Sequence, residues 1–249
     1  MSKKLTQYYK KSIRKRPYIN IWAIVVSVIV ITSFLMIALG VSAHKIKEYS
    51  EKNFYFVYSG KYTQINFANE QCTKVTDMGG AGVLYYVGNT KFVIINAYFN
   101  ESDANSVKSK VVEMFSDAGV IKVTANKLSK KSAQHILSIS ACKLYYRKFH
   151  DFCNSLYSMI IDYDLEKNMT SAVYKNVMLY KQQFQEISAQ LQLNADDVSK
   201  NMYSSALLVI EQINNFFSSS FVSNNIGKYL KKMYVNAIIE FVDLCENIK

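Results

Sequence analysis

The sequence contains little proline, cysteine or histidine. One proline and eight glycines in 249 residues exclude collagen-like and proline-rich linker chains. Four cysteines are too few for a disulfide scaffold in a chain of this length. Half of the residues are hydrophobic, which excludes a fully disordered chain and predicts one or two domains with a buried core.

The positive charge is concentrated near the N-terminus. The whole chain has a net charge of +11, but residues 1–18 carry seven basic side chains and no acidic one. The rest of the chain therefore has a net charge of only +4. The basic character belongs to a local tail, so a nucleic-acid interpretation based on the overall charge loses most of its support. We therefore expect no nucleic-acid partner.

An uncharged, mostly apolar run at residues 19–43 follows the basic tail. As a helix, this run would span about 37 Å, which exceeds the ~30 Å hydrocarbon core of a bilayer. Seven basic residues precede the run, and four follow it up to and including Lys61. This difference favours a cytoplasmic N-terminus. The sequence therefore predicts a single transmembrane helix that contacts membrane lipid, with the remaining residues outside the cytoplasm.

A cleaved signal peptide is the alternative interpretation of this run. The apolar region of a signal peptide has only about 7–15 residues, although Val41-Ser42-Ala43 does resemble a cleavage site. Because the run at 19–43 is longer, we expect an uncleaved anchor, followed by a short polar stalk over 44–52.

Strand and helix patterns alternate in the segment 53–124. Aromatic and β-branched residues predict strands, and apolar residues at helical spacing that end at a glycine predict helices. Their order, β-α-β-β-α-β, predicts an antiparallel sheet with two helices on one face. The expected strands are 54–59, 83–87, 91–97 and 120–124, and the expected helices are 64–78 and 102–118.

From residue 129 onward the sequence has no proline and a single glycine. Hydrophobic residues recur with helical periodicity, which predicts an antiparallel bundle over 129–249. The complete expectation is an α+β fold class with an N-terminal transmembrane helix, a βαββαβ domain of ferredoxin or RNP type, and a C-terminal all-α helical bundle. The expected bundle helices are 129–162, 171–193, 194–217 and 226–247.

Several residues between 54 and 123 match the pattern of a bacterial family. The first strand and its exit are matched by Tyr55, Val57, Gly60 and Tyr62, and Ala68 matches an alanine in the first helix. On these residues, together with Phe92, Ile94, Phe99 and the helix start at Glu101–Ala104, the segment resembles a SPOR domain. This is the sporulation-related repeat that binds septal peptidoglycan.

The resemblance implies a membrane-anchored, non-catalytic protein of the cell wall or septum, active in division or sporulation. Its partner would be peptidoglycan glycan strands, and it would need no cofactor. The family binds glycan on the sheet face that points away from the two helices. Alternation along the strands assigns five side chains to that face. These candidate glycan-binding residues are Phe54, Phe56, Tyr58, Val93 and Ile95.

The candidate face departs from the family pattern. Tyr58 replaces a family glutamine and Val93 replaces a family arginine, so the face is almost entirely apolar. One interpretation is that the face still stacks on sugars. The other is that the helical bundle, a partner or a second copy covers it. In the second case the protein is a membrane-tethered scaffold that binds septal or envelope proteins through its bundle.

RNA recognition is a further interpretation of the same element order, because RRM domains share it. The strand Lys91–Asn96 lacks the glycine and paired aromatics of the RRM signature, and the expected topology places it outside the cytoplasm. Both observations argue against RNA binding.

The side chains needed for catalysis are sparse. The histidines are His44, His135 and His150, and the pair His150 and Cys153 lacks a second pair of metal ligands nearby in the sequence. Gly79–Gly82 precedes a strand and lacks the Lys-Ser/Thr of a phosphate-binding loop, so it predicts a turn. We therefore expect no enzyme and no metal site.

The cysteines of the predicted bundle lie within apolar stripes. Cys142 and Cys153 are separated by three helical turns on one predicted helix, which prevents them from pairing with each other there. We expect buried thiols, with a bridge from Cys245 to either of them as the alternative.

Overall fold

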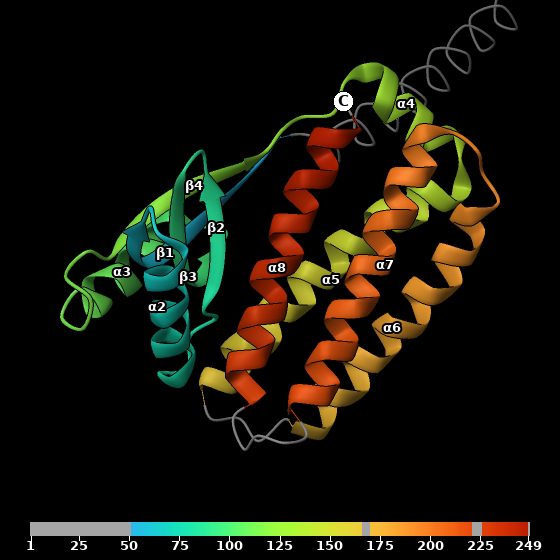
Figure 1. Ribbon diagram of the computed structural model, residues 1–249. Helices are drawn as coiled ribbons and strands as arrows, with labels where there is room; N and C mark the ends of the chain where they lie inside the picture. The colour runs from blue at the N-terminus through green and yellow to red at the C-terminus, as the bar shows by residue number, and fades with distance from the viewer. Residues whose placement is uncertain (1–50, 166–169, 221–225, 249) are drawn as a thin grey trace, which may run out of the picture. The chain divides into compact units, whose positions relative to one another are not determined.

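The structure is a computed structural model that describes residues 51–165, 170–220 and 226–248. All of these residues belong to one compact unit. Among them are four antiparallel strands and seven helices (Figure 1). The predicted transmembrane helix at 19–43 and the basic tail at 1–18 lie outside the described residues, as does nearly all of the predicted stalk.

The strands are β1 (Lys52–Tyr62), β2 (Val83–Val87), β3 (Thr90–Tyr98) and β4 (Gly119–Ala125), and their order in the sheet is β2-β3-β1-β4. Gly88, with a φ of 57°, forms the tight turn between β2 and β3. β1 is central and pairs with both β3 and β4. The order of strands and helices along this segment is the predicted one.

The pairing of β1 with β3 contains a bulge that sets the direction of the side chains. Val57 pairs with Asn96 and Tyr58 pairs with Ile94, so that Ile95 is an extra residue on β3. An extra residue changes the phase of alternation along a strand. Consequently Ile94 packs on the same side of the sheet as Tyr58, whereas Ile95 packs on the opposite side.

Two helices, α2 (Ile65–Asp77) and α3 (Glu101–Val111), cover one face of the sheet (Figure 1). Ala68 of α2 packs against Val93 of β3, and Ala104 of α3 packs against residues of β1 and β3. Both alanines are completely buried. A small side chain at each contact allows the helix to lie close to the strands.

The remaining helices follow the sheet. The predicted helix over 129–162 is divided at Ile139, whose extended backbone (φ −104°, ψ 114°) separates α4 from α5. The helix predicted over 194–217 extends through Ser220, three residues into the predicted break, and the Ser218 hydroxyl donates a hydrogen bond to the carbonyl of Asn214. The bounds are α4 (Lys130–Ser138), α5 (Ser140–Asp164), α6 (Thr170–Gln192), α7 (Asp197–Ser220) and α8 (Ile226–Asn247).

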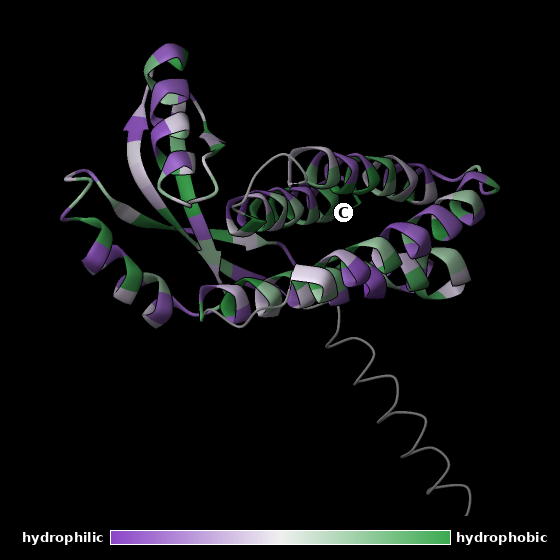
Figure 2. Ribbon diagram, turned by 90° about the horizontal axis from the view of Figure 1, so that it is seen from below, coloured by the Kyte–Doolittle hydropathy of each residue, from purple (hydrophilic) through white to green (hydrophobic). Residues whose placement is uncertain are grey.

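Helix α8 lies between the sheet and the other long helices (Figure 1). It contacts β2, β3 and β4 on one side and α5 and α7 on the other. In Figure 2 the long helices alternate between green hydrophobic and purple hydrophilic residues, as expected for helices that are partly exposed. The buried residues of α8 instead extend around more than one side of the helix, and they include Leu230, Met233, Tyr234, Val235, Ile238, Phe241 and Leu244.

These observations correct the predicted fold class. The sheet is not a free-standing SPOR-type domain beside an independent bundle, because Phe56 and Ile94 share one hydrophobic core with Tyr234 and Phe241 of α8. Over the described part of the chain, no helix combines the length and the apolar character needed to cross a bilayer. The predicted division into domains at 53–124 and 129–249 stays a prediction that unfolding experiments can test.

Candidate functional site

The β1 residues of the predicted glycan-binding face are buried, and α8 packs against Phe54. Phe54, Phe56 and Tyr58 are only 3%, 0% and 8% exposed, and all three belong to the core shared with α8. The ring of Phe54 meets the ring of Phe241 edge-on, with 6.4 Å between centroids. A sugar could therefore stack on the Phe54 ring only if α8 moved away.

Val93 and Ile95, the other predicted residues of that face, lie on the opposite face of the sheet. Val93 is fully buried against Ala68 and Val75 of α2, and Ile95 packs against the same cluster. Simple alternation assigns Val93 and Ile95 of β3 to the wrong face of the sheet. The face that each side chain takes depends on the pairing register and on the bulge at Ile95. The five predicted residues consequently do not form a single surface.

Tyr58 also borders an open cavity of about 470 Å³ beside β4. Glu101 and Lys108 of α3 and Lys122 of β4 contribute charges of both signs to its lining. The Tyr58 hydroxyl lies over Gly119, where an added side chain would collide with it. The mixed charges do not favour a ligand of either sign.

A polar cluster lies at the N-terminal end of α7. The Nε2 atom of His135 is 2.9 Å from Oδ1 of Asp196, which also accepts a hydrogen bond from the backbone N–H of Ser199 at 2.9 Å. The Ser199 hydroxyl donates to Oδ2 of Asp196 at 2.6 Å and lies 3.2 Å from Sγ of Cys142. Because the carboxylate stands between serine and histidine, the histidine is not placed to remove the serine proton as in a serine hydrolase. The cluster is a helix cap.

The Asp196 carboxylate is strongly acidic in this cap. Burial opposes its charge, but the hydrogen bonds from Ser199 and His135 outweigh burial and lower the pKa of Asp196 to about 2. A wide cavity of about 620 Å³ opens beside it. Over the described residues, no three His, Cys, Asp or Glu side chains are grouped to hold a metal ion.

All four cysteines are thiols. Cys142, Cys153 and Cys245 are buried among the helices, and Cys72 of α2 is half-buried. Burial raises the pKa of Cys153 to about 12, so this thiol stays protonated at neutral pH. A buried, protonated thiol is not a nucleophile, which argues against a catalytic site formed by His150 and Cys153.

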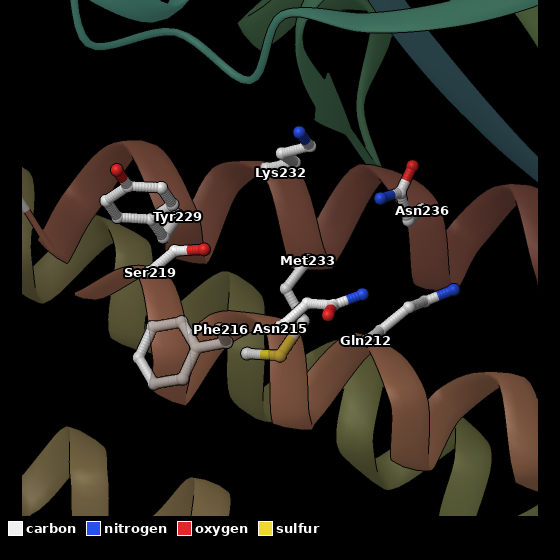
Figure 3. Close-up of a pocket in the computed structure, with 8 residues that line it drawn as sticks. All are labelled: Gln212, Asn215, Phe216, Ser219, Tyr229, Lys232, Met233 and Asn236. Carbon is white, nitrogen blue, oxygen red and sulfur yellow. The ribbon is translucent and has the colours of Figure 1, made fainter. Parts of the chain in front are cut away.

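A polar groove, the α7–α8 groove, lies between the last two helices (Figure 3). It encloses a cavity of about 230 Å³. The side chains that line it come in equal numbers from the two helices. They are Gln212, Asn215, Phe216 and Ser219 of α7, and Tyr229, Lys232, Met233 and Asn236 of α8.

The helical spacing of these residues explains why they meet. On each helix the lining positions recur every three or four residues, which places them on one side of the helix. The two helices run in opposite directions, so Gln212 lies at the same end of the groove as Asn236, and Ser219 lies near Tyr229 (Figure 3). Polar groups therefore line both walls.

The floor of the groove is apolar. Phe216 and Met233 are 2% and 3% exposed, and Met233 extends from α8 toward Phe216 (Figure 3). Lys232 is exposed at the rim. The Oε1 atom of Gln212 is buried and accepts no hydrogen bond from the described residues. Buried polar atoms without a partner are uncommon in proteins, but this oxygen is closed to solvent and does not face the open groove.

Hydrophobic periodicity finds the core residues of α7 and α8 but misses the groove. The signal that the sequence does contain is a second set of polar residues, repeated at the same helical spacing beside the apolar stripe. One set runs from Gln212 to Ser219 and the other from Tyr229 to Asn236. Their meeting depends on how the two helices are rotated, which the sequence does not specify.

Comparison with protein-family models, with curated proteins and with solved structures finds no match to this chain. The resemblance to the SPOR family therefore stays a prediction. The same holds for peptidoglycan as a partner, so the function has to be argued from the packing and the chemistry of the described residues.

Proposed function

We propose that this protein is a non-catalytic, membrane-tethered interaction protein of the cell envelope. The tether is proposed from the uncharged run at 19–43 and from the basic residues that precede it. The interaction role is supported by one observation above all. Helix α8 packs on the sheet face that carries Phe54, where the Phe54 and Phe241 rings meet, so this face is part of the protein core.

The energetics of this packing argue against glycan binding at the sheet. Burial of a phenylalanine side chain contributes roughly 1.5–3 kcal/mol, and several aromatic rings are buried between the sheet and α8. A hydrogen bond to a sugar would return only about 0.5–1.5 kcal/mol. A few such bonds do not compensate for separating α8 from the sheet.

The polar clusters support a non-catalytic role. Asp196 separates Ser199 from His135 in the cap of α7, and Cys153 is held protonated by burial. Neither arrangement supplies an activated nucleophile. Both groups instead have structural roles, as a helix cap and as a buried core thiol.

The outer helices offer positions for contact with a protein partner. Met178 and Leu179 of α6 and Leu207 and Leu208 of α7 are between 42% and 50% exposed. A photoreactive amino acid at Leu179 or Leu208 of the full chain, expressed in cells, is expected to form discrete crosslinks to the same protein after irradiation. Absence of any protein crosslink from either position contradicts the proposal.

Retention on purified cell-wall sacculi distinguishes this function from glycan binding. The full chain in detergent is expected to show no retention that responds to amidase treatment of the sacculi. Amidase-dependent retention that is lost in a folded Tyr58→Ala variant would establish the sheet as a glycan site and overturn the proposal.

Protease treatment of intact, wall-stripped cells tests the membrane topology. Residues 44–249 are expected to be digested, because the basic flank favours a cytoplasmic N-terminus. Complete protection of these residues would contradict an outward orientation.

A further inference from the structure

We infer that the α7–α8 groove binds a short, extended peptide segment that carries a carboxylate. This inference rests on the interaction role proposed for the protein and gives the partner a chemistry. It is carried by two polar rows that face each other over an apolar floor, with one cation and no acid among the eight described residues that line the groove.

The polar rows match the needs of a peptide backbone. Each peptide unit offers one N–H donor and one C=O acceptor. The carboxamides of Asn215 and Asn236 can each donate and accept at the same time, and the hydroxyls of Ser219 and Tyr229 can do the same. The amide nitrogen of Gln212 can donate. Side chains of this kind can bind a backbone in which donors and acceptors alternate.

The length of the rows fits a few peptide residues. Ser219 follows Gln212 by seven positions, and Asn236 follows Tyr229 by the same number. At ~1.5 Å of rise per residue, each row is about 10 Å long. An extended chain advances about 3.3 Å per residue, so the groove accommodates about three residues of a strand-like segment.

The charge of the groove selects an anion. Lys232 is exposed and is the charged residue among those that line the cavity. A carboxylate that accepts a hydrogen bond from a lysine ammonium forms a charge-assisted interaction, which is stronger than a neutral one. An aspartate or glutamate of the bound segment, or its terminal carboxylate, would satisfy Lys232 while its backbone contacts the amides.

Sugar and nucleic acid fit this groove less well. Phe216 is buried in the floor, and the Lys228 ammonium lies 5.2 Å from the centroid of the Tyr229 ring, which leaves at most one face of Tyr229 for stacking on a sugar. A nucleic acid requires several phosphate contacts, whereas the groove has a single lysine.

Selection from a displayed library of random hexapeptides, using the full chain in detergent micelles, tests the inference. We expect the selected peptides to carry aspartate or glutamate at a constant position. A fluorescein-labelled copy of one selected peptide then allows affinity to be measured by fluorescence anisotropy. Methyl-¹³C methionine labelling, with the Met233 signal assigned by Met233→Leu, should show that this signal shifts on titration.

The Lys232→Gln variant should bind the peptide about ten times more weakly, as expected for the loss of one charge-assisted hydrogen bond. Replacing the acidic residue of the peptide by its amide should weaken binding to the wild-type chain by a similar factor but have little further effect on Lys232→Gln. The matched control Lys175→Gln removes an exposed lysine of α6 and should leave affinity unchanged. Gln212→Leu should also weaken binding without lowering thermal stability.

Three results would overturn the assignment. They are selected peptides without an acidic residue, affinity that Lys232→Gln does not change, and displacement of the peptide by a short oligosaccharide such as chitotetraose. Selection of no peptide at all also overturns it. The crosslinks expected from Leu179 or Leu208 test the interaction role at a different surface, so the two proposals can fail separately.

Discussion

The ring of Phe54 in β1 meets the ring of Phe241 in α8 at 83°, with 6.4 Å between their centroids. The Phe241 ring also contacts the rings of Tyr146 and Phe149 of α5, with 5.5 Å between centroids in both pairs. A single side chain of α8 thus joins the sheet to the long helices. This contact allows the coupling between the two parts of the protein to be measured.

Phe241→Ala should lower the free energy of unfolding by about 3–5 kcal/mol, because it leaves a cavity where two parts of the core meet. Urea unfolding followed by circular dichroism measures the change. Strand and helix signals should be lost together. Leu208→Ala, at an exposed position of α7, is the control and should change stability by less than about 0.5 kcal/mol. Two separate transitions, with only the helical one shifted, would instead support separate domains at 53–124 and 129–249.

Gly119→Ala tests the position of Tyr58. A β-carbon at residue 119 would collide with the Tyr58 hydroxyl, so the variant should be destabilised by about 1–3 kcal/mol. In a Tyr58→Ala background the same change should have almost no effect, since the colliding group is absent. Thermal unfolding of the wild type, the two single variants and the double variant measures the coupling between the two positions. Additive effects would show that Tyr58 does not lie over Gly119.

The cap of α7 should make stability depend on pH in the acid range. The pKa of Asp196 is about 2 in the folded protein, below the value of about 3.9 expected when unfolded. Ionised Asp196 therefore stabilises the fold above about pH 4, and this contribution is lost as the pH falls toward about 2. Asp196→Asn should have a lower melting temperature than wild type at neutral pH. In acid the melting temperatures of the two proteins should become similar.

The neighbouring Asp197 provides the control for this prediction. Its side chain is 96% exposed and its ion pair with Lys200 is long, at 3.6 Å. Asp197→Asn should therefore keep the acid dependence of the wild type. The role assigned to Asp196 is wrong if both variants have the same pH profile.

Alkylation should report the charge of Lys232 through Cys72. Burial raises the pKa of the Cys72 thiol, and the positive charge of Lys232 opposes this increase. Lys232→Gln should therefore raise the pKa further and slow the reaction of Cys72 with iodoacetamide at mildly alkaline pH. Mass spectrometry of the native protein measures the rate, and Lys175→Gln should leave it unchanged. Equal rates in all three proteins would show that Lys232 does not influence this thiol.

The order of elements in the sheet could be predicted because local signals mark the turns. Gly79, Gly82 and Gly88 all have positive φ, a conformation that glycine adopts without strain, and they separate α2, β2 and β3. The packing of α8 against the sheet can also be predicted in part from the sequence. The apolar residues of α8 occupy more positions than one stripe requires, which indicates a helix with neighbours on two sides.

The side-chain directions on β3 could not be predicted from the sequence. Both faces of the sheet are apolar, so polarity does not show which residues of Lys91–Ala97 face the helices. The bulge at Ile95 then changes the phase within the strand. The α7–α8 groove was unpredictable for a related reason, since it depends on the relative rotation of two helices.

The position of α8 also has a consequence for the synthesis of the protein. One hundred residues separate Ala125 at the end of β4 from Ile226 at the start of α8. During translation all four strands emerge while Phe54 and Phe56 still have no helix to cover them. An uncovered apolar sheet is the kind of surface on which nascent chains aggregate and to which chaperones bind. The arrival of α8 at the sheet therefore determines when the first strand ceases to be an aggregation site.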